Sequence, residues 1–513
     1  MMEYILDLME EESISLDLSS YDPEGKHKNR KSDASLFNES RNHMKDDFGL
    51  YELRLLALTQ LGYIPVAAAM LMTTFMEPSQ EWCQTIQGNS SNWYTKPTKE
   101  FYSLTVQYDF ACQANSNHIT AVMSSLLMWG ALLGSFICGF ASDKFGRKPV
   151  YLGCLGMVTV GHLFFASSSV ITWLGINAGL AFVGFFCGGY MVTNFVILTE
   201  AFELPRSRLL VVSLNGWSIS MAITAALAYT TQYWLTYHLF IGIIGILLVI
   251  LSSSMTWESC RWLSANGMHR EAKKNSLRIT VLNNKKMINE EDIVILEWYE
   301  ILGFSAPTHT EEKKTWKTLF KSARFLKPTV VMFYSFLASS IVSFGFYFSI
   351  DVLPGDRYLN MGIMGLLKFV LGFTPFVVNQ FLTKRAIAIS SVGLCCIAAF
   401  LILPIQYYKI IDFQWIVIVL SLFVAAGIDP TWKINHLYST ELFPTSVRSM
   451  ARGVCNAGGR LGSVMAPMIV YMRTLGVVVP NTIFAALLLV QLIVFVVFLP
   501  DDNDREANEI NDE

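Results

Sequence analysis

A few charged residues lie inside long apolar segments of this chain, and they are the side chains best placed to do chemistry. Lys368 stands in "MGLLKFVLGF", Arg460 in "NAGGRLGS", and Asp429 in "GIDPTWKINHLY". A charge inside such a segment is costly to keep, so each is a candidate for function. An arginine can hold a carboxylate or a sulfate through two charge-assisted hydrogen bonds. Two cations with one nearby acid therefore favour a site for an organic molecule that bears such a group.

The spacing of the charges adds a second indication. Lys433 and His436 follow Asp429 by four and seven residues, so the three share one helical face that is suited to line a cavity. The first half of the chain supplies three uncharged candidates for binding: Tyr190, Asn194 and Trp217. A structural alternative stays open, in which Lys368 extends toward a surface and Arg460 pairs with Asp429.

The composition of the chain indicates that the apolar segments cross a membrane. Of 513 residues, 53% are hydrophobic and only 15% are charged, whereas a soluble protein carries about 25% charged residues. A mean hydropathy of +0.41 does not fit a soluble core of ordinary size, so the class is a polytopic membrane protein. The net charge of −3 indicates no particular partner, and nothing suggests nucleic acid.

Twelve apolar segments are long enough to cross a lipid bilayer as helices, which need about 20 residues each. They lie near 53–75, 119–141, 149–168, 173–199, 209–231, 235–255, 328–350, 359–382, 386–405, 414–438, 450–473 and 479–499. We therefore predict an all-α polytopic membrane protein with twelve transmembrane helices in two six-helix bundles.

Polar regions divide this predicted fold into five parts. We predict a cytoplasmic tail over 1–50, a six-helix bundle over 51–256 with an extracellular loop at 77–117, a cytoplasmic central loop over 257–327, a second bundle over 328–500 and an acidic cytoplasmic tail over 501–513. Lys and Arg concentrate in the short loops that we place in the cytoplasm, which is the general rule for membrane proteins. Both termini are therefore expected in the cytoplasm.

The predicted extracellular loop carries two features that fit an oxidising compartment. Asn89 begins the sequence "NSS", an acceptor for N-glycosylation. Cys83 and Cys112 are the only two of nine cysteines that this topology exposes outside the cell, and we expect a disulfide between them. Two free thiols are the alternative.

A short charged loop, "GFASDKFGRKP", joins the second and third apolar segments. Gly139 would let the helix end approach another backbone closely, and Asp143 is suited to accept backbone N–H groups at a neighbouring helix end. Arg147 and Lys148 can pair with acids or lipid phosphates, and Gly146 completes the pattern. We interpret these five residues as a gating element, with simple positive charge on a cytoplasmic loop as the alternative.

Two similar stretches end the fourth and the tenth segments. Glu200 and Arg208 lie in "TEAFELPRSR", and Glu441 and Arg448 lie in "TELFPTSVR". Each puts a Glu near a helix end and an Arg about two turns on, which indicates an internal repeat whose halves rock about a central site. These four residues are also candidates for gating, and salt bridges within their own loops are an equally open interpretation.

The charged loop, as G-x-x-x-D-K-x-G-R-K, resembles the loop signature of the major facilitator superfamily. Three further stretches, "YSTELFPTSVRSMARGVCNAGGRLGSVMAP", "VQYDFACQAN" and "ESCRWL", are similar to the organic cation, anion and carnitine transporter family of solute carriers. The resemblance implies alternating access between two bundles, with the loop as an ionic latch that holds them together in one state. Cys260, where that family has Pro, marks a divergent member.

The resemblance also bears on the substrate. Lys368 matches a position where the family's cation transporters carry Glu, and Arg460 matches one where they carry Asp and where anion and carnitine members carry Arg. It thus implies a plasma-membrane transporter of small organic ions, favouring anions or carnitine-like zwitterions, by facilitated diffusion or exchange. The alternatives are an organic cation transporter and a non-transporting sensor or scaffold, which the degenerate second loop copy "NQFLTKRA" favours. Because the chain has no nucleophile–base set, nucleotide-binding loop or metal cluster, neither an enzyme nor a cofactor or nucleotide is predicted.

Overall fold

The computed structural model describes residues 48–78, 83, 101–113, 115–167, 171–202, 205–214, 216–284, 323–351, 353–408, 414–443 and 445–499. Within these ranges the regular structure is helical, apart from one isolated β-bridge between Tyr102 and Tyr233. Asn89 lies outside the described residues, so its glycosylation stays a prediction. The structure joins Cys83 and Cys112 in a disulfide.

The N-terminal group of described helices contains six spans. In chain order they are α3 (Leu50–Leu61) continued by α4 (Tyr63–Leu71) and η2 (Met72–Phe75), α7 (Ser116–Phe145), α8 (Arg147–Ala166), α9 (Trp173–Ala201), α10 (Pro205–Ser213) continued by α11 (Gly216–Thr231), and α12 (Trp234–Met255). Three shorter helices lie outside these spans: α6 (Leu104–Gln107), α13 (Cys260–Ala265) and α14 (His269–Asn284).

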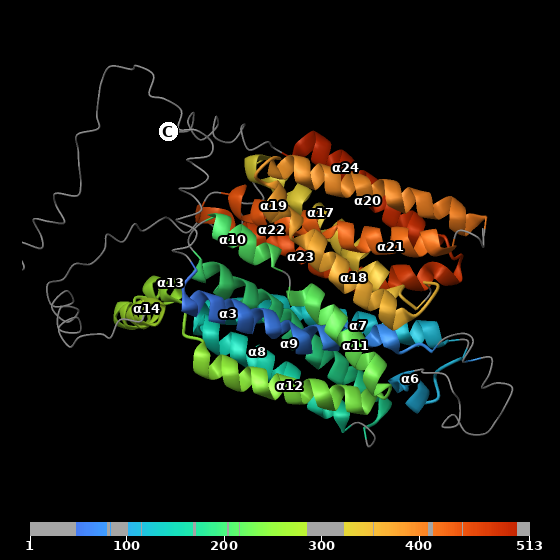
Figure 1. The fold of residues 1–513 in the computed structure, drawn as a ribbon, viewed down its shortest axis with the longest axis horizontal. Coiled ribbons are helices and arrows are strands. Elements are labelled where there is room, and N and C mark those ends of the chain that lie inside the picture. The colour runs from blue at the N-terminus through green and yellow to red at the C-terminus, as the bar shows by residue number, and fades with distance from the viewer. Residues whose placement is uncertain are drawn as a thin grey trace, which may run out of the picture. The chain divides into compact units, whose positions relative to one another are not determined.

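The C-terminal group of described helices also contains six spans. They are α17 (Ala323–Phe348), α18 (Arg357–Gly372) with α19 (Thr374–Val378), α20 (Lys384–Tyr407), α21 (Gln414–Gly427) with α22 (Asp429–Glu441), α23 (Thr445–Tyr471) with η6 (Met472–Thr474), and α24 (Val479–Phe498). The two groups lie side by side, with α7 against α23 and α11 against α18 (Figure 1). Helices α13 and α14 lie at one end of the helices and α6 at the other.

Eleven of these helical spans are long and apolar enough to cross a membrane. The remaining one, α23, carries Arg448, Arg452 and Arg460 among its apolar residues and glycines. The predicted fold class of twelve helices in two groups of six is confirmed, and the span outside these eleven is the one that carries the three arginines.

Small residues set the spacing inside the N-terminal group. A Cβ atom on Gly188 of α9 would lie 2.0 Å from the carbonyl oxygen of Ala131 in α7. Only glycine allows two backbones to approach this closely, which is how helices commonly pack in membranes. A larger residue at this position would push apart the two longest helices of the group, which also line the site described below.

Two neighbouring spans are interrupted where they face each other. The break between α21 and α22 falls at Ile428, and Pro430 follows in the first turn of α22, where its missing N–H breaks no helical bond. The break between α18 and α19 falls at Phe373. A Cβ atom on Gly372 would lie 2.5 Å from the Asp429 carboxylate, so the end of α18 leaves room for this acid. Interrupted helices of this kind surround substrate sites in many transporters.

Polar contacts join the two groups at the end that carries α6. Arg473 lies 2.8 Å from the Asp351 carboxylate and donates to Asn117 at 2.6 Å, while Arg357 donates to the Glu77 carbonyl at 2.5 Å. We call these five residues the distal clamp. Phe75 and Tyr358 stack across the same junction with ring centroids 5.5 Å apart. The clamp therefore connects α7 and the residues that follow η2 in one group with α18, η6 and the residues that follow α17 in the other.

Candidate binding cavity

A cavity of about 600 Å³ lies between the two groups of helices. At its inner part it is lined by Trp217, Tyr347 and Lys368, and it extends to Asp143 and Arg147 at the turn between α7 and α8. This volume suits an organic molecule of ordinary drug size. The cavity thus reaches from the middle of the spans toward the end that carries α13, away from the distal clamp.

Lys368, Asp429 and Lys433 form one charged wall of the cavity. The Lys368 Nζ atom lies 3.0 Å from one Asp429 carboxylate oxygen, and the Lys433 Nζ atom lies 3.9 Å from the other. Lys368 also donates to the Ser343 hydroxyl at 3.3 Å and to the Ala425 carbonyl at 3.1 Å, and its side chain is only 2% exposed. Asp429 therefore compensates these two lysines, and Lys368 is largely occupied by the protein.

Arg460 of α23 lines the cavity in a different electrostatic setting. Its guanidinium donates to the Met191 sulfur at 3.3 Å, and among the described residues no carboxylate forms an ion pair with it. The alternative pairing of Arg460 with Asp429 is wrong, because Asp429 is held by the two lysines. Arg460 is therefore a cavity cation without an anionic partner in the described part of the chain.

Arg452 is a second arginine of this kind, and the sequence interpretation missed it. Its guanidinium carbon lies 4.2 Å from the centre of the Phe195 ring, and it lines the same cavity. Arg452, Asn456 and Arg460 are spaced by four residues along α23. That spacing is visible in the sequence and would have placed Arg452 on the same helical face as Arg460.

Of the three uncharged binding candidates in the first half of the chain, two line the cavity and one does not. Asn194 and Trp217 line the cavity, and the Asn194 amide donates to the Thr59 carbonyl at 3.3 Å. The expectation that Tyr190 lines the cavity is corrected. The residue is fully buried outside the cavity lining, and its hydroxyl donates to the Thr59 carbonyl at 2.8 Å. Its role is to fix α9 against α3. The structure brings other aromatic side chains to the cavity that were not predicted to bind: Tyr63, Phe344, Tyr347 and Trp432.

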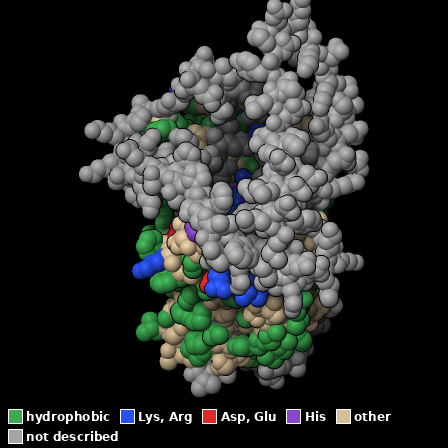
Figure 2. Space-filling view, turned by 90° about the vertical axis from the view of Figure 1, so that its left-hand side faces the viewer, with side chains coloured by type: hydrophobic (Ala, Val, Ile, Leu, Met, Phe, Trp, Pro, Cys, Tyr) green, Lys and Arg blue, Asp and Glu red, His purple; other side chains and the backbone are tan. Residues whose placement is uncertain are grey.

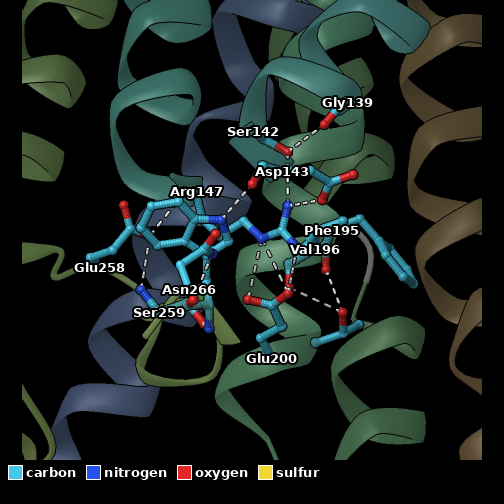
Figure 3. A network of polar contacts seen from close by, with 12 residues as sticks. Gly139, Ser142, Asp143, Arg147, Phe195, Val196, Glu200, Glu258, Ser259 and Asn266 are labelled. Atoms are coloured by element: carbon cyan, nitrogen blue, oxygen red, sulfur yellow. Dashed lines mark hydrogen bonds and ion pairs between the residues drawn. The ribbon is translucent and has the colours of Figure 1, made fainter. Parts of the chain in front are cut away.

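The turn between α7 and α8 holds a compact ionic network (Figure 3). Arg147 pairs with the Asp143 carboxylate and lies 3.0 Å from that of Glu200 on α9. The Glu258 carboxylate accepts the backbone N–H of Arg147 at 2.9 Å and that of Lys148 at 3.2 Å. All the described partners of this network belong to the N-terminal group or to the segment that enters α13.

Two expectations for this turn need correction in detail, and the pairing of Lys148 with lipid phosphates stays a prediction. Asp143 pairs with Arg147 instead of capping a helix, and its backbone carbonyl accepts from the Trp262 indole at 2.8 Å. Gly139 meets no backbone closely, since a Cβ atom there would find only the Val192 side chain at 3.5 Å. Lys148 takes part through its backbone N–H and not through an ion pair in the described structure.

Gly146 is the position of the turn where glycine is required. Its φ angle is +110°, and a Cβ atom would lie 2.5 Å from the Glu258 carboxylate. Glycine adopts this backbone conformation without strain, and its missing side chain leaves Glu258 in contact with the turn. The sequence pattern singled out this residue as part of a gating element, which stays a prediction, and its partner Glu258 was outside the predicted set.

The Glu and Arg residues at the end of the fourth segment contact different partners. Glu200 pairs with Arg147, whereas the Arg208 guanidinium donates to the Phe202 carbonyl at 2.8 Å. The side chains of Glu441 and Arg448 lie outside the described residues.

Figure 2 shows the end of the molecule that carries α13 and α14, with Lys and Arg side chains gathered on it.

Comparison with known proteins gives a consistent result. The family model of the Major Facilitator Superfamily matches residues 63–467. "Solute carrier family 22 member 15" of Xenopus tropicalis is 27% identical over 379 residues, which cover 71% of this chain and 67% of that protein. "Organic anion transporter 3" of Homo sapiens is 24% identical over 398 residues, covering 76% and 70%.

Two solved structures share the arrangement of the helices. The xylose transporter XylE from E. coli, in a partially occluded inward open conformation, aligns with a TM-score of 0.60 and 13% identity, covering 88% of this chain and 99% of that one. The human organic anion transporter MFSD10 aligns with a TM-score of 0.56 and 14% identity, covering 86% and 99%. At these identities the likeness concerns the fold alone.

Proposed function

Because the chain belongs to the major facilitator superfamily, we propose that it moves small organic anions, or zwitterions such as carnitine-like compounds, across a membrane by alternating access. The transport is facilitated diffusion or exchange. The similarity to an organic anion transporter supports the choice of substrate class. We further propose that the protein resides in the plasma membrane with both termini and the α13 end in the cytoplasm.

The setting of the Arg460 guanidinium is the observation that carries this proposal. The guanidinium lines a cavity of substrate size and has no carboxylate partner in the described structure. The Arg460 side chain is partly buried, where a charge without a partner is costly, and a bound carboxylate or sulfate would supply the partner. The same cavity is lined by five Lys or Arg residues and three Asp or Glu residues, so its charge favours an anion.

The arrangement of Asp429 argues against the organic cation alternative. Its carboxylate is the only acidic group near the inner part of the described cavity, and two lysines already contact it. An organic cation would have to displace an ammonium group to reach it. A zwitterion remains compatible, because its carboxylate can bind Arg460 while its cationic group faces the aromatic side chains of Tyr63 or Trp217.

The two ends of the cavity support alternating access. The distal clamp joins the two groups of helices, whereas the described ionic network of the α7–α8 turn stays within the N-terminal group. We propose that this is the state open toward the cytoplasm. In the opposite state the clamp separates and the charges of the turn contact the C-terminal group.

Uptake by cells that express the wild-type chain tests the proposed function. A panel of labelled organic anions, zwitterions and cations of similar size is compared, with surface labelling to confirm delivery. We expect saturable uptake of anions or zwitterions and mutual competition between them. Good uptake of simple organic cations without any uptake of anions would overturn the proposal, and so would the absence of all uptake from protein that has reached the surface.

A further inference from the structure

Two free cysteines of neighbouring helices lie together inside the N-terminal group, and the proposed function gives them no role. Cys138 of α7 and Cys154 of α8 are both buried, with 6% and 2% of their surface exposed. Each stands eight residues from Gly146, one before and one after the turn that joins the two helices. Because the helices run back along each other from this turn, equal distances from it bring the two side chains to the same level.

A glycine on a third helix makes room for both thiols. A Cβ atom on Gly189 of α9 would lie 2.6 Å from the Cys138 sulfur and 2.7 Å from the Cys154 sulfur. Two sulfurs this close to one point are neighbours, and the two thiols interact with each other. A larger residue at position 189 would take the place of the sulfurs. Three helices thus meet at a buried dithiol.

The other free cysteines of the described chain do not form such a pair. Cys395 and Cys396 are adjacent in α20, but adjacent residues of a helix do not face each other, and the Cys395 thiol donates to a backbone carbonyl of α21. Cys187 lies near Cys154, but its thiol donates to a backbone carbonyl of α4. Among the described residues, no three His, Cys, Asp or Glu side chains gather to hold a metal ion. Cys138 and Cys154 therefore suit a ligand atom that forms two bonds to sulfur.

A trivalent arsenic atom with one organic substituent has this bonding requirement. An organoarsenic oxide reacts with two thiols so that the bonds between arsenic and oxygen break and two arsenic–sulfur bonds form. The oxygen leaves with the two thiol protons as water, and no electrons are transferred, so the step needs no oxidant or reductant. Thiols are soft ligands that prefer soft partners of this kind. An uncharged aryl arsenical also dissolves in a membrane, from which it can approach buried thiols.

We propose that Cys138 and Cys154 form a dithiol site that binds one monosubstituted trivalent arsenical per chain. The bridging atom cannot take the position of the absent Cβ, because that position is only one carbon–carbon bond, about 1.5 Å, from the Gly189 Cα atom. The atom must lie farther out and press α9 away from α7 and α8. Since α9 supplies Met191 and Asn194 to the cavity, the bound arsenical should lower transport. This effect on transport rests on the proposed function, whereas the binding does not.

Mass spectrometry of the purified full-length chain after treatment with phenylarsine oxide tests the binding directly. We expect one adduct on the wild type that survives an excess of a monothiol and is removed by a 1,2-dithiol. Cys138→Ser and Cys154→Ser should each lose this adduct, because a single arsenic–sulfur bond exchanges with the monothiol. Cys395→Ser and Cys396→Ser are matched controls that should keep it. The corresponding Cys→Ala variants repeat the test without a buried hydroxyl.

Uptake by cells that express these variants gives the second readout. Uptake by the wild type should fall after treatment with the arsenical and recover with the dithiol, whereas Cys138→Ser and Cys154→Ser should stay active and insensitive. An adduct that persists in either of these variants, or that a monothiol removes from the wild type, would overturn the dithiol site. A stable adduct without any effect on uptake would overturn the displacement of α9. A wild type without uptake before treatment would count against the proposed function, and the mass measurement would still decide the binding.

Discussion

The two charged walls of the cavity differ in whether their cations form ion pairs with an acid. On the wall formed by α18 and α22, Lys368 and Lys433 share the Asp429 carboxylate, at 3.0 Å and 3.9 Å. On the wall formed by α23, Arg452 and Arg460 have no carboxylate partner among the described residues. The lysines come with an acid, and we propose that the arginines, which form no ion pair in the described structure, bind an anionic substrate. This contrast can be tested from either wall.

Reversing the charge of the α23 wall should give the largest effect. Arg460→Asp places a carboxylate where the proposal puts the substrate anion, so we expect uptake of anions to be lost and organic cations to be admitted. The measurement is uptake of labelled anions and cations at matched surface levels. Anion uptake close to that of the wild type would contradict the assignment of Arg460 to binding.

Removing the acid of the opposite wall should act mainly on stability. Asp429→Asn leaves Lys368 and Lys433 without compensation, and loss of one partner of a buried pair costs about 3–5 kcal/mol of the free energy of unfolding. Arg460→Met removes a cation that has no acidic partner in the described structure, so its cost should be much smaller. Thermal unfolding of the purified variants in detergent compares them.

The double variant Lys368→Met with Asp429→Leu supplies the control for this comparison. Replacing both members of a buried pair by apolar residues of similar size is often close to neutral. We therefore expect it to recover much of the stability that Asp429→Asn loses. Equal losses for Asp429→Asn and Arg460→Met would erase the contrast between the two walls.

Arg147 lies at the rim of the cavity and should affect a different step of transport. The Arg147→Ala variant removes the contacts with Asp143 and Glu200 without touching either wall. We expect the maximal rate to fall several-fold while the apparent affinity changes by less than about twofold, as for a residue outside substrate binding. A variant with normal surface levels that mainly weakens affinity would instead assign Arg147 to the binding site.

The distal clamp should respond to pH through Glu77, with a smaller effect. Burial raises the pKa of the Glu77 carboxyl above its ordinary value of 4.5, and the nearby Asp351 carboxylate adds to this, against hydrogen bonds from Ser116 and Thr120 and the charge of Arg473. The clamped state therefore holds a proton more tightly than a state in which Glu77 is solvated. Lowering the pH from above the raised pKa toward 4.5 should favour the clamped state, and raising it should favour opening.

A cysteine introduced in place of Thr74, which lies in the small cavity behind the clamp, reports this opening. Its labelling by an impermeant thiol reagent from the α6 side should slow as the pH falls, after correction for the pH dependence of the thiol itself. Glu77→Gln should remove the pH dependence. If the dependence persists in that variant, another group of the clamp is responsible.

The sequence predicted the membrane-spanning helices well, because long apolar runs determine them directly. The sequence motifs also indicated the major facilitator superfamily, and the family model that matches residues 63–467 confirms this prediction. Lys368, Asp429, Lys433 and Arg460 all line the cavity, since charges inside apolar helices have few other places to lie.

The partners of these residues could not be predicted, because they depend on distances between separate helices. Asp429 meets Lys368 only because α18 and α22 begin or end at the same junction, where Gly372 leaves space. Tyr190 was misplaced because a buried tyrosine and a cavity tyrosine look alike in a sequence. Arg452 was overlooked because it stands near the start of a helix whose lower apolarity obscured its face.

The affinity of Arg460→Ala for a labelled monocarboxylate, measured beside that of Lys368→Ala, tests the contrast between the two walls most directly. Removing one partner of a desolvated charge pair costs about 2–5 kcal/mol, and 1.4 kcal/mol is a factor of ten. We therefore expect Arg460→Ala to weaken binding at least about tenfold, Arg460→Lys to recover only part of it because an ammonium cannot make two parallel bonds, and Lys368→Ala to weaken it less. An unchanged affinity in Arg460→Ala, or a larger loss in Lys368→Ala at equal surface levels, would contradict the assignment of the anion site to α23.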